Sequence, residues 1–157
     1  MNIKKMIGAA VACLLLALPT VSVAQEILTV TNGESTVTYT LEELLALPQE
    51  IVTTTNDYVD VIATFQGPSL QSVLEGSNID RNAEIQMSAI NDFTISGPAE
   101  DAFSYDVILA LLRDGEQMTV RDKGPIWVIY PMDDHPELRD DLYNGRLVWQ
   151  LKSIAVE

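Results

Sequence analysis

The sequence predicts a single α+β domain that contains a mixed β-sheet and short helices. Short runs rich in β-branched and aromatic residues recur along the chain, each bounded by Gly, Pro, Asn or Asp, and such runs favour strands. Between them lie three isolated segments with helical start and stop signals. The 157 residues suffice for one hydrophobic core and are few for two.

The N-terminus has the three parts of a secretory signal peptide. Lys4 and Lys5 precede an apolar run over residues 6–18, and Ser22-Val23-Ala24 provides a small-residue cleavage site. We expect residues 1–24 to be removed, which leaves a domain of residues 25–157 exported to a bacterial periplasm. The apolar run is shorter than a membrane span requires, so we expect no membrane insertion of the mature chain.

Composition excludes several classes of function for the mature domain. The single cysteine, Cys13, lies inside the predicted signal peptide, so no disulfide, thiolate nucleophile or sulfur ligand is expected in residues 25–157. The signal peptide also contains two of the nine basic residues and none of the 23 acidic ones, which leaves a net charge of −16. A surface this acidic repels phosphate backbones, so nucleic acid is not an expected partner.

The first half of the chain combines a hairpin with two short capped helices. Residues 26–31 and 35–40 favour strands joined at Asn32-Gly33, and Thr40 with Glu43 forms a capping box for a helix over residues 41–47. Three further strands are expected, over residues 51–55, 59–65 and 83–90. A helix after Ser69 is expected to end at Gly76.

In the second half, the pattern predicts one longer helix and three strands. The helix is expected over residues 105–113, capped by Ser104 and closed by Asp114-Gly115. Residues 133–144 are acidic and favour a loop with one helical turn. The expected strands cover residues 116–120, 126–130 and 147–156.

Both tryptophans lie close to basic residues in the sequence, and two interpretations fit them. Trp127 and Trp149, with Lys123 and Arg146 nearby, could form a flat pocket wall for a planar polar heterocycle. Alternatively, both indole rings belong to the hydrophobic core. The Asn91-Asp92 pair ends an expected strand; there the Asp92 carboxylate could accept two N–H bonds from an amino-pyrimidinone edge, or the pair simply forms an Asx turn.

Other chemistries find little support. The only histidine, His135, lies in the acidic loop, where an exposed structural role is the alternative to a catalytic one. One histidine cannot build a typical zinc or copper site, and the acidic run lacks the EF-hand pattern. The glycines are isolated and form no nucleotide-binding loop.

Five segments in order resemble the molybdopterin-binding domain of the sulfite oxidase family. They are FQGPSLQSVL (65–74), SAINDF (88–93), DVILA (106–110) with DG (114–115), KGPIWVIYP (123–131) and RLVWQLK (146–152). The resemblance extends over residues 51–156 and implies the fold of that family. Members that bind molybdenum use a cysteine on the strand before the Phe-x-Gly segment, where this chain has IVTTTN (51–56). A hydroxyl does not replace a thiolate as a soft ligand, so molybdenum is not expected.

The resemblance also implies a pterin site. Lys123 and Arg146 fall where the family places cationic residues that hold its cofactor, while Trp127 stands near the position of an arginine. Trp149 belongs to the last group, and Tyr130 follows Trp127 on the same expected strand. The pattern is similar to cysteine-less periplasmic proteins that bind reduced pterins and regulate a membrane-bound diguanylate cyclase/phosphodiesterase of cyclic-di-GMP signalling.

We therefore expect a ligand sensor, not an enzyme, that contacts the periplasmic region of such an inner-membrane protein. The predicted ligand-binding residues are Asn91, Asp92, Lys123, Trp127, Tyr130, Arg146 and Trp149. The acidic loop is a candidate contact region for the partner or a solvated face. The alternatives are a molybdopterin-dependent oxidoreductase subunit and an adaptor domain with an empty pocket.

Overall fold

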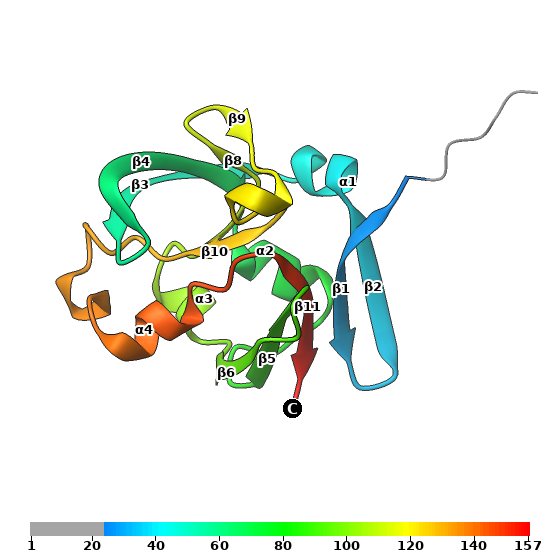
Figure 1. Ribbon diagram of the computed structural model, residues 1–157. Helices are drawn as coiled ribbons and strands as arrows, with labels where there is room; N and C mark the ends of the chain where they lie inside the picture. Colours follow the sequence, from blue (N-terminus) through cyan, green and yellow to red (C-terminus); the bar gives the residue numbers. More distant parts are fainter. Residues whose placement is uncertain (1–23) are drawn as a thin grey trace, which may run out of the picture.

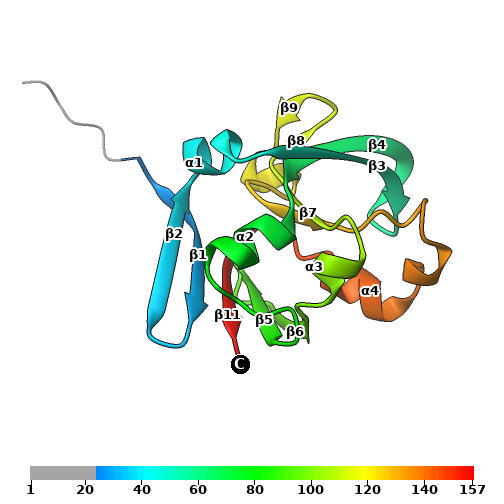
Figure 2. The ribbon, with the colours of Figure 1, turned by 180° about the vertical axis from the view of Figure 1, so that it is seen from behind.

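The computed structural model describes residues 24–157, so the predicted signal peptide lies outside the described residues except for Ala24. The described chain forms three sheets connected by short helices (Figures 1 and 2). The five-stranded sheet has the order β2-β1-β11-β5-β6, the four-stranded sheet β3-β4-β8-β9, and the two-stranded ribbon pairs β10 with β7. No helix within residues 24–157 is both long and apolar enough to cross a membrane.

The strands of the five-stranded sheet are β1 (Glu26–Asn32), β2 (Ser35–Thr40), β5 (Glu84–Ala89), β6 (Thr94–Pro98) and β11 (Leu151–Val156). The strands of the other sheets are β3 (Gln49–Asn56), β4 (Val59–Pro68), β7 (Ile108–Ala110), β8 (Leu112–Arg113), β9 (Glu116–Gln117) and β10 (Trp127–Ile129). The helices are α1 (Leu41–Ala46), α2 (Leu70–Gly76), α3 (Asp101–Ser104) and α4 (Asp141–Arg146), with 3-10 turns η1 (Val120–Asp122) and η2 (Pro136–Leu138).

The five-stranded sheet is mixed, as predicted. The β1–β11 pair is parallel, whereas the other three strand pairs of this sheet, β1–β2, β11–β5 and β5–β6, are antiparallel. The first hairpin turns one residue later than expected, because Asn32 pairs with Ser35 and leaves Gly33 and Glu34 as the loop. Gly33 has a φ of +60°, so the glycine occupies the loop position where a left-handed backbone is needed.

Both N-terminal helices begin as their caps predict. The Thr40 hydroxyl accepts from the Glu43 N–H at 3.2 Å, and the Glu43 carboxylate accepts from the Thr40 N–H at 2.8 Å. The Ser69 hydroxyl accepts from the Ser72 N–H at 3.1 Å. These contacts satisfy backbone donors that a helix start leaves unpaired.

The β7/β10 ribbon lies between two hydrophobic cores. In Figures 1 and 2 it passes between the four-stranded sheet and the five-stranded sheet. On β10 and its flanks the side chains alternate: Ile126, Val128 and Tyr130 face the larger core, and Trp127 and Ile129 face the smaller one. The ribbon is therefore buried on both faces, and its sequence is apolar at every position.

The prediction of a helix over residues 105–113 is wrong. The described chain has the short helix α3 before this segment, followed by strands β7 and β8, and Asp114-Gly115 forms the turn between β8 and β9. Val107, Leu109 and Leu111 face the larger core, while Ile108 and Ala110 face the smaller one. A continuous apolar run is compatible both with a buried helix and with a strand buried on both faces. Because a hydrophobic core lies on each side of this segment, the strand is formed.

The remaining differences are one additional strand and several element boundaries. β6 was not predicted, and the strand expected over residues 116–120 shortens to β9 followed by η1. The final strand begins at Leu151 and not at residue 147, since Gln150 has a φ of +54°. The acidic loop contains η2 and the start of α4. Most residues that line the pocket described next lie in α4 and in the segment between α4 and β11.

Candidate ligand-binding pocket

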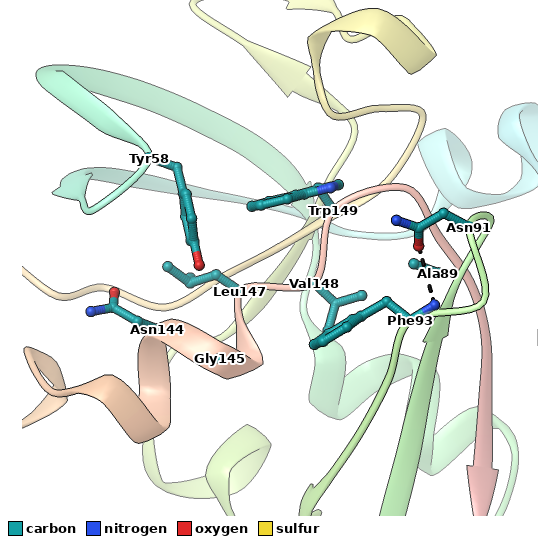
Figure 3. A pocket seen from close by; sticks show the side chains of 9 residues that line it. All are labelled: Tyr58, Ala89, Asn91, Phe93, Asn144, Gly145, Leu147, Val148 and Trp149. Carbon is teal, nitrogen blue, oxygen red and sulfur yellow. Dashed lines mark hydrogen bonds between the residues drawn. The ribbon is translucent and has the colours of Figure 1, made fainter.

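A pocket of about 270 Å³ opens between the β3–β4 turn, the end of β5 and the segment that links α4 to β11 (Figure 3). Its lining residues are Tyr58, Ala89, Asn91, Phe93, Asn144, Gly145, Leu147, Val148 and Trp149. No charged side chain is among them. Pockets for drug-sized molecules measure roughly 300–1,000 Å³, so this one suits a small ring system.

Three aromatic rings surround the opening. Tyr58 meets Trp149 edge to face, with ring centroids 4.6 Å apart and an interplanar angle of 86°. Tyr58 is 41% exposed and Phe93 is 47% exposed, although exposing large apolar side chains to water is unfavourable. Exposed rings gathered around a concave apolar surface are typical of a binding site for a flat molecule.

The two predicted tryptophans have different environments. Trp127 is fully buried, packs edge to face on Phe65 with centroids 5.3 Å apart, and donates its indole N–H to the Leu147 carbonyl at 3.1 Å. Trp149 is only partly buried and lines the pocket. Trp127 is therefore a residue of the hydrophobic core, whereas Trp149 forms part of the pocket wall.

Lys123 connects these two rings without lining the pocket. Its ammonium lies 5.5 Å from the ring centroid of Trp127 and 5.4 Å from that of Trp149. Cation–π contacts at such distances contribute on the order of 0.5–1 kcal/mol at partly exposed sites. The Lys123 carbonyl accepts from the Gln150 N–H at 2.9 Å, which also fixes the backbone next to Trp149.

Two amide side chains provide polar groups at the pocket. The Asn91 side-chain oxygen accepts from the Phe93 N–H at 3.2 Å and thereby forms an Asx turn that presents the Phe93 ring. The Asn144 amide donates to the Asp57 carboxylate at 2.6 Å, and its oxygen has no partner within the described chain.

Asp92 does not line the pocket. Its side chain is 88% exposed and accepts from the Lys152 ammonium at 2.6 Å. That hydrogen bond, together with the lysine charge, lowers the pKa of the Asp92 carboxyl below its ordinary value. The structure therefore places Asp92 within the Asx turn, with its side chain in a surface ion pair.

Arg146 and Tyr130 are buried away from the pocket in a cluster around Asp101. The Arg146 guanidinium and the Tyr130 hydroxyl donate to the same Asp101 oxygen at 2.8 Å and 3.0 Å. Burial, and then the nearby Asp101 charge, raises the pKa of Tyr130 well above its ordinary value. A carboxylate taken from water needs such donors, so the cluster has a structural explanation.

Of the seven residues predicted from the sequence, the pocket lining includes Asn91 and Trp149. Lys123 does not line the pocket but contacts the Trp149 ring, which does. The other four, Asp92, Trp127, Tyr130 and Arg146, are not among the lining residues. Sequence reasoning missed Tyr58, Phe93 and Asn144. Tyr58 and Phe93 each follow an Asn-Asp pair, and an aromatic residue in such a polar turn could have indicated a binding site. No feature of the sequence singled out Asn144.

The donor set does not fit a molybdenum centre held by cysteine. Residues 24–157 contain no cysteine. On the strand where the family places that ligand, the fully buried Thr54 hydroxyl donates to the Thr55 carbonyl at 3.0 Å and accepts from the Asp133 N–H at 3.1 Å. Within the described residues, no three His, Cys, Asp or Glu side chains group together in a way that could hold a metal ion.

Comparison with known proteins defines the fold. No model of a protein family and no curated protein matches the sequence. Among solved structures, the chain is similar to the sulfane dehydrogenase SoxCD from Paracoccus pantotrophus, with a TM-score of 0.61 and 16% sequence identity. The match includes 82% of this chain and 37% of that chain. The protein is thus a single α+β domain with the sulfite oxidase-like molybdopterin-binding fold, as the sequence predicted.

Proposed function

We propose that this protein is a metal-free periplasmic pterin-binding protein that passes ligand occupancy to the periplasmic region of an inner-membrane cyclic-di-GMP enzyme. The observation that carries the proposal is the open aromatic pocket on a molybdopterin-binding fold without a thiolate ligand. Trp149 supplies the stacking surface, and a base-like ring on an indole contributes about 1–3 kcal/mol per stacked ring.

The pocket chemistry favours an unphosphorylated ring over the complete molybdopterin. A phosphate requires a cation or several free N–H donors, and the lining residues include no lysine or arginine. The Arg146 charge is neutralised by Asp101 at 2.8 Å. The net charge of −16 expected for the exported domain opposes anionic ligands further.

The test of ligand binding uses the two tryptophans as separate reporters. The purified domain is titrated with 6,7-dimethyl-tetrahydropterin while tryptophan fluorescence and binding heat are recorded. We expect saturable quenching that persists in Trp127→Phe and disappears in Trp149→Phe, because only the second ring lines the pocket. No saturable heat with the wild-type protein would contradict the proposal.

The alternative function, a subunit of a molybdopterin-dependent oxidoreductase, is supported by the structural similarity to SoxCD. Metal analysis of protein purified from its native host separates the two. Molybdenum near one atom per chain would favour the oxidoreductase, whereas a tetrahydropterin released on denaturation, with no molybdenum, would favour the sensor. An empty pocket in the native protein would favour an adaptor domain.

The surface that would contact the partner is the acidic segment between Asp133 and Asp141. It leads directly into α4, whose end lines the pocket at Asn144, so a ligand and a partner could act on one element. Charge reversal at the exposed Asp134 and Glu137 leaves the pocket side chains intact. We expect this variant to bind tetrahydropterin normally and to leave a reconstituted partner enzyme unresponsive. A normal partner response would contradict this surface.

A further inference from the structure

The Asn144 side chain is held in one orientation by a residue from a distant part of the chain. Its amide nitrogen donates to an Asp57 carboxylate oxygen at 2.6 Å, and the two residues are 87 positions apart. An ionised carboxylate only accepts hydrogen bonds, so the Asn144 nitrogen faces Asp57 and the oxygen faces the other way. Asp57 therefore fixes which atom of the amide is left for a ligand.

That remaining oxygen is an unpaired acceptor on a residue that lines the pocket. It is closed off from solvent and has no hydrogen-bond partner within residues 24–157. An unpaired buried acceptor costs roughly 1–3 kcal/mol, and nearly all such groups in folded proteins find a partner. An N–H group of a ligand that pairs with this oxygen would remove that cost.

The side chain next to Asp57, Tyr58, lines this end of the pocket. Tyr58 is half exposed, and in Figure 3 its hydroxyl end points toward the part of the pocket formed by Leu147 and Asn144. Because the Asn144 oxygen has no open solvent contact, a ligand can reach it only when a neighbouring side chain moves. The exposed ring of Tyr58, on a turn between two strands, is the neighbour with room to move.

We infer that Asn144 is the specificity-determining residue of the pocket: its side-chain oxygen accepts an N–H from a neutral nitrogen heterocycle, and Asp57 is the positioning residue. The inference rests on the proposed function and gives Asn144 the recognition role that sequence reasoning gave to Asp92, which is paired with Lys152. A ring nitrogen without hydrogen would be repelled by this oxygen. When the N5–N8 edge of the ring faces this oxygen, a tetrahydropterin is preferred, because it has N–H groups at N5 and N8 where the oxidised ring has bare nitrogens.

The experiment compares Asn144→Leu with a matched control outside the pocket lining. Asn82 also donates its side-chain amide to an aspartate, Asp80, at 2.8 Å, and it does not line the pocket. Affinities for 6,7-dimethyl-tetrahydropterin and for the oxidised 6,7-dimethylpterin are measured by calorimetry. We expect Asn144→Leu to weaken binding of the reduced ring about tenfold and Asn82→Leu to change it less than about twofold.

An exchange variant tests the positioning role. In D57N/N144D the new amide at position 57 donates to the new carboxylate at position 144, which leaves an acceptor oxygen for the ligand. We expect this variant to bind the reduced ring within about threefold of wild type, although D57N alone binds more weakly. Thermal melting confirms that each variant is folded, and Asn144→Ala replaces Asn144→Leu should the latter not fold.

The outcomes separate this inference from the proposed function. Absence of binding by the wild-type protein overturns both. Tight wild-type binding that Asn144→Leu and Asn144→Ala leave unchanged overturns the role of Asn144 alone. Loss of binding in the exchange variant, with normal binding in D57N, overturns the positioning role of Asp57.

Discussion

The buried pair of Arg146 and Asp101 allows a direct test between a structural and a ligand-binding role for this arginine. Both side chains are about 10% exposed, and the Tyr130 hydroxyl shares the Asp101 oxygen that Arg146 contacts at 2.8 Å. Arg146→Met removes the charge and keeps most of the aliphatic stem. Asp101 would then remain buried with the Tyr130 hydroxyl as its only side-chain donor among those described.

The expected loss of stability is large for a single substitution. Removing one partner from a buried ion pair costs about 3–5 kcal/mol, because the other charge stays desolvated. The Arg146 Nε atom has no partner in the described chain, so the lower end of that range applies. For a domain of this size, with an unfolding entropy of about 2.1 cal/mol/K per residue, the melting temperature falls by roughly 10 °C.

The assay combines thermal unfolding, followed by circular dichroism, with calorimetric titration of 6,7-dimethyl-tetrahydropterin. We expect Arg146→Met to melt at a lower temperature and, while folded, to bind the pterin as wild type does. Replacing both charges, in D101L/R146M, should recover part of the stability because no charge remains buried. A variant that melts like wild type but no longer binds would refute the structural assignment of Arg146.

Three further predictions concern the scaffold. Thr40→Ala, which removes the capping box of α1, lowers the free energy of unfolding by about 1 kcal/mol in urea denaturation, and no change would contradict the cap. Gly67→Ala brings a Cβ into a clash with the Leu109 carbonyl oxygen, so β4 and β7 must separate; we expect the free energy of unfolding to fall by about 3 kcal/mol, measured in the same way. The hydrogen bond from Arg81 lowers the pKa of Glu100 to about 2 from 4.5. Because the pKa of Glu100 is lower in the folded protein, its contribution to stability is complete above about pH 4.5 and is lost as the pH falls toward 2. The melting temperature of Arg81→Met should therefore change less with pH across this range than that of the wild-type protein.

Local signals in the sequence predicted local structure. The capping box at Thr40, the Ser69 cap and the Asn32-Gly33 hairpin depend on residues within a few positions of one another, and the structure has all three elements. The residues 105–113 depend on long-range packing instead. Their apolar run fits a buried helix and a doubly buried strand equally well, and the deciding fact, a second core on the other side, is absent from the local sequence.

The same reasoning explains which tryptophan could have been assigned in advance. Trp127 stands in a run where every neighbour is apolar, which indicates a strand buried on both faces, so its ring has to be core. Trp149 is followed by the polar Gln150, whose positive φ ends the regular pairing and leaves the indole at the edge of the fold. The polarity of the flanking residues, more than the closeness of basic residues, separates the two rings.

The pocket itself was hard to predict because turns and a short helix build most of it. Tyr58 and Asp57 come from the β3–β4 turn, whereas Asn144 comes from α4, and only tertiary structure brings them together. The end of β3, next to this turn, contacts the acidic segment, since the Thr55 hydroxyl donates to the Asp133 carboxylate at 2.8 Å. The turn therefore supplies an aromatic wall and orients the acceptor amide, and the adjoining end of β3 contacts the segment proposed to face the partner. A ligand that displaces Tyr58 would act on all three through this turn, which gives the proposed signalling a short physical route.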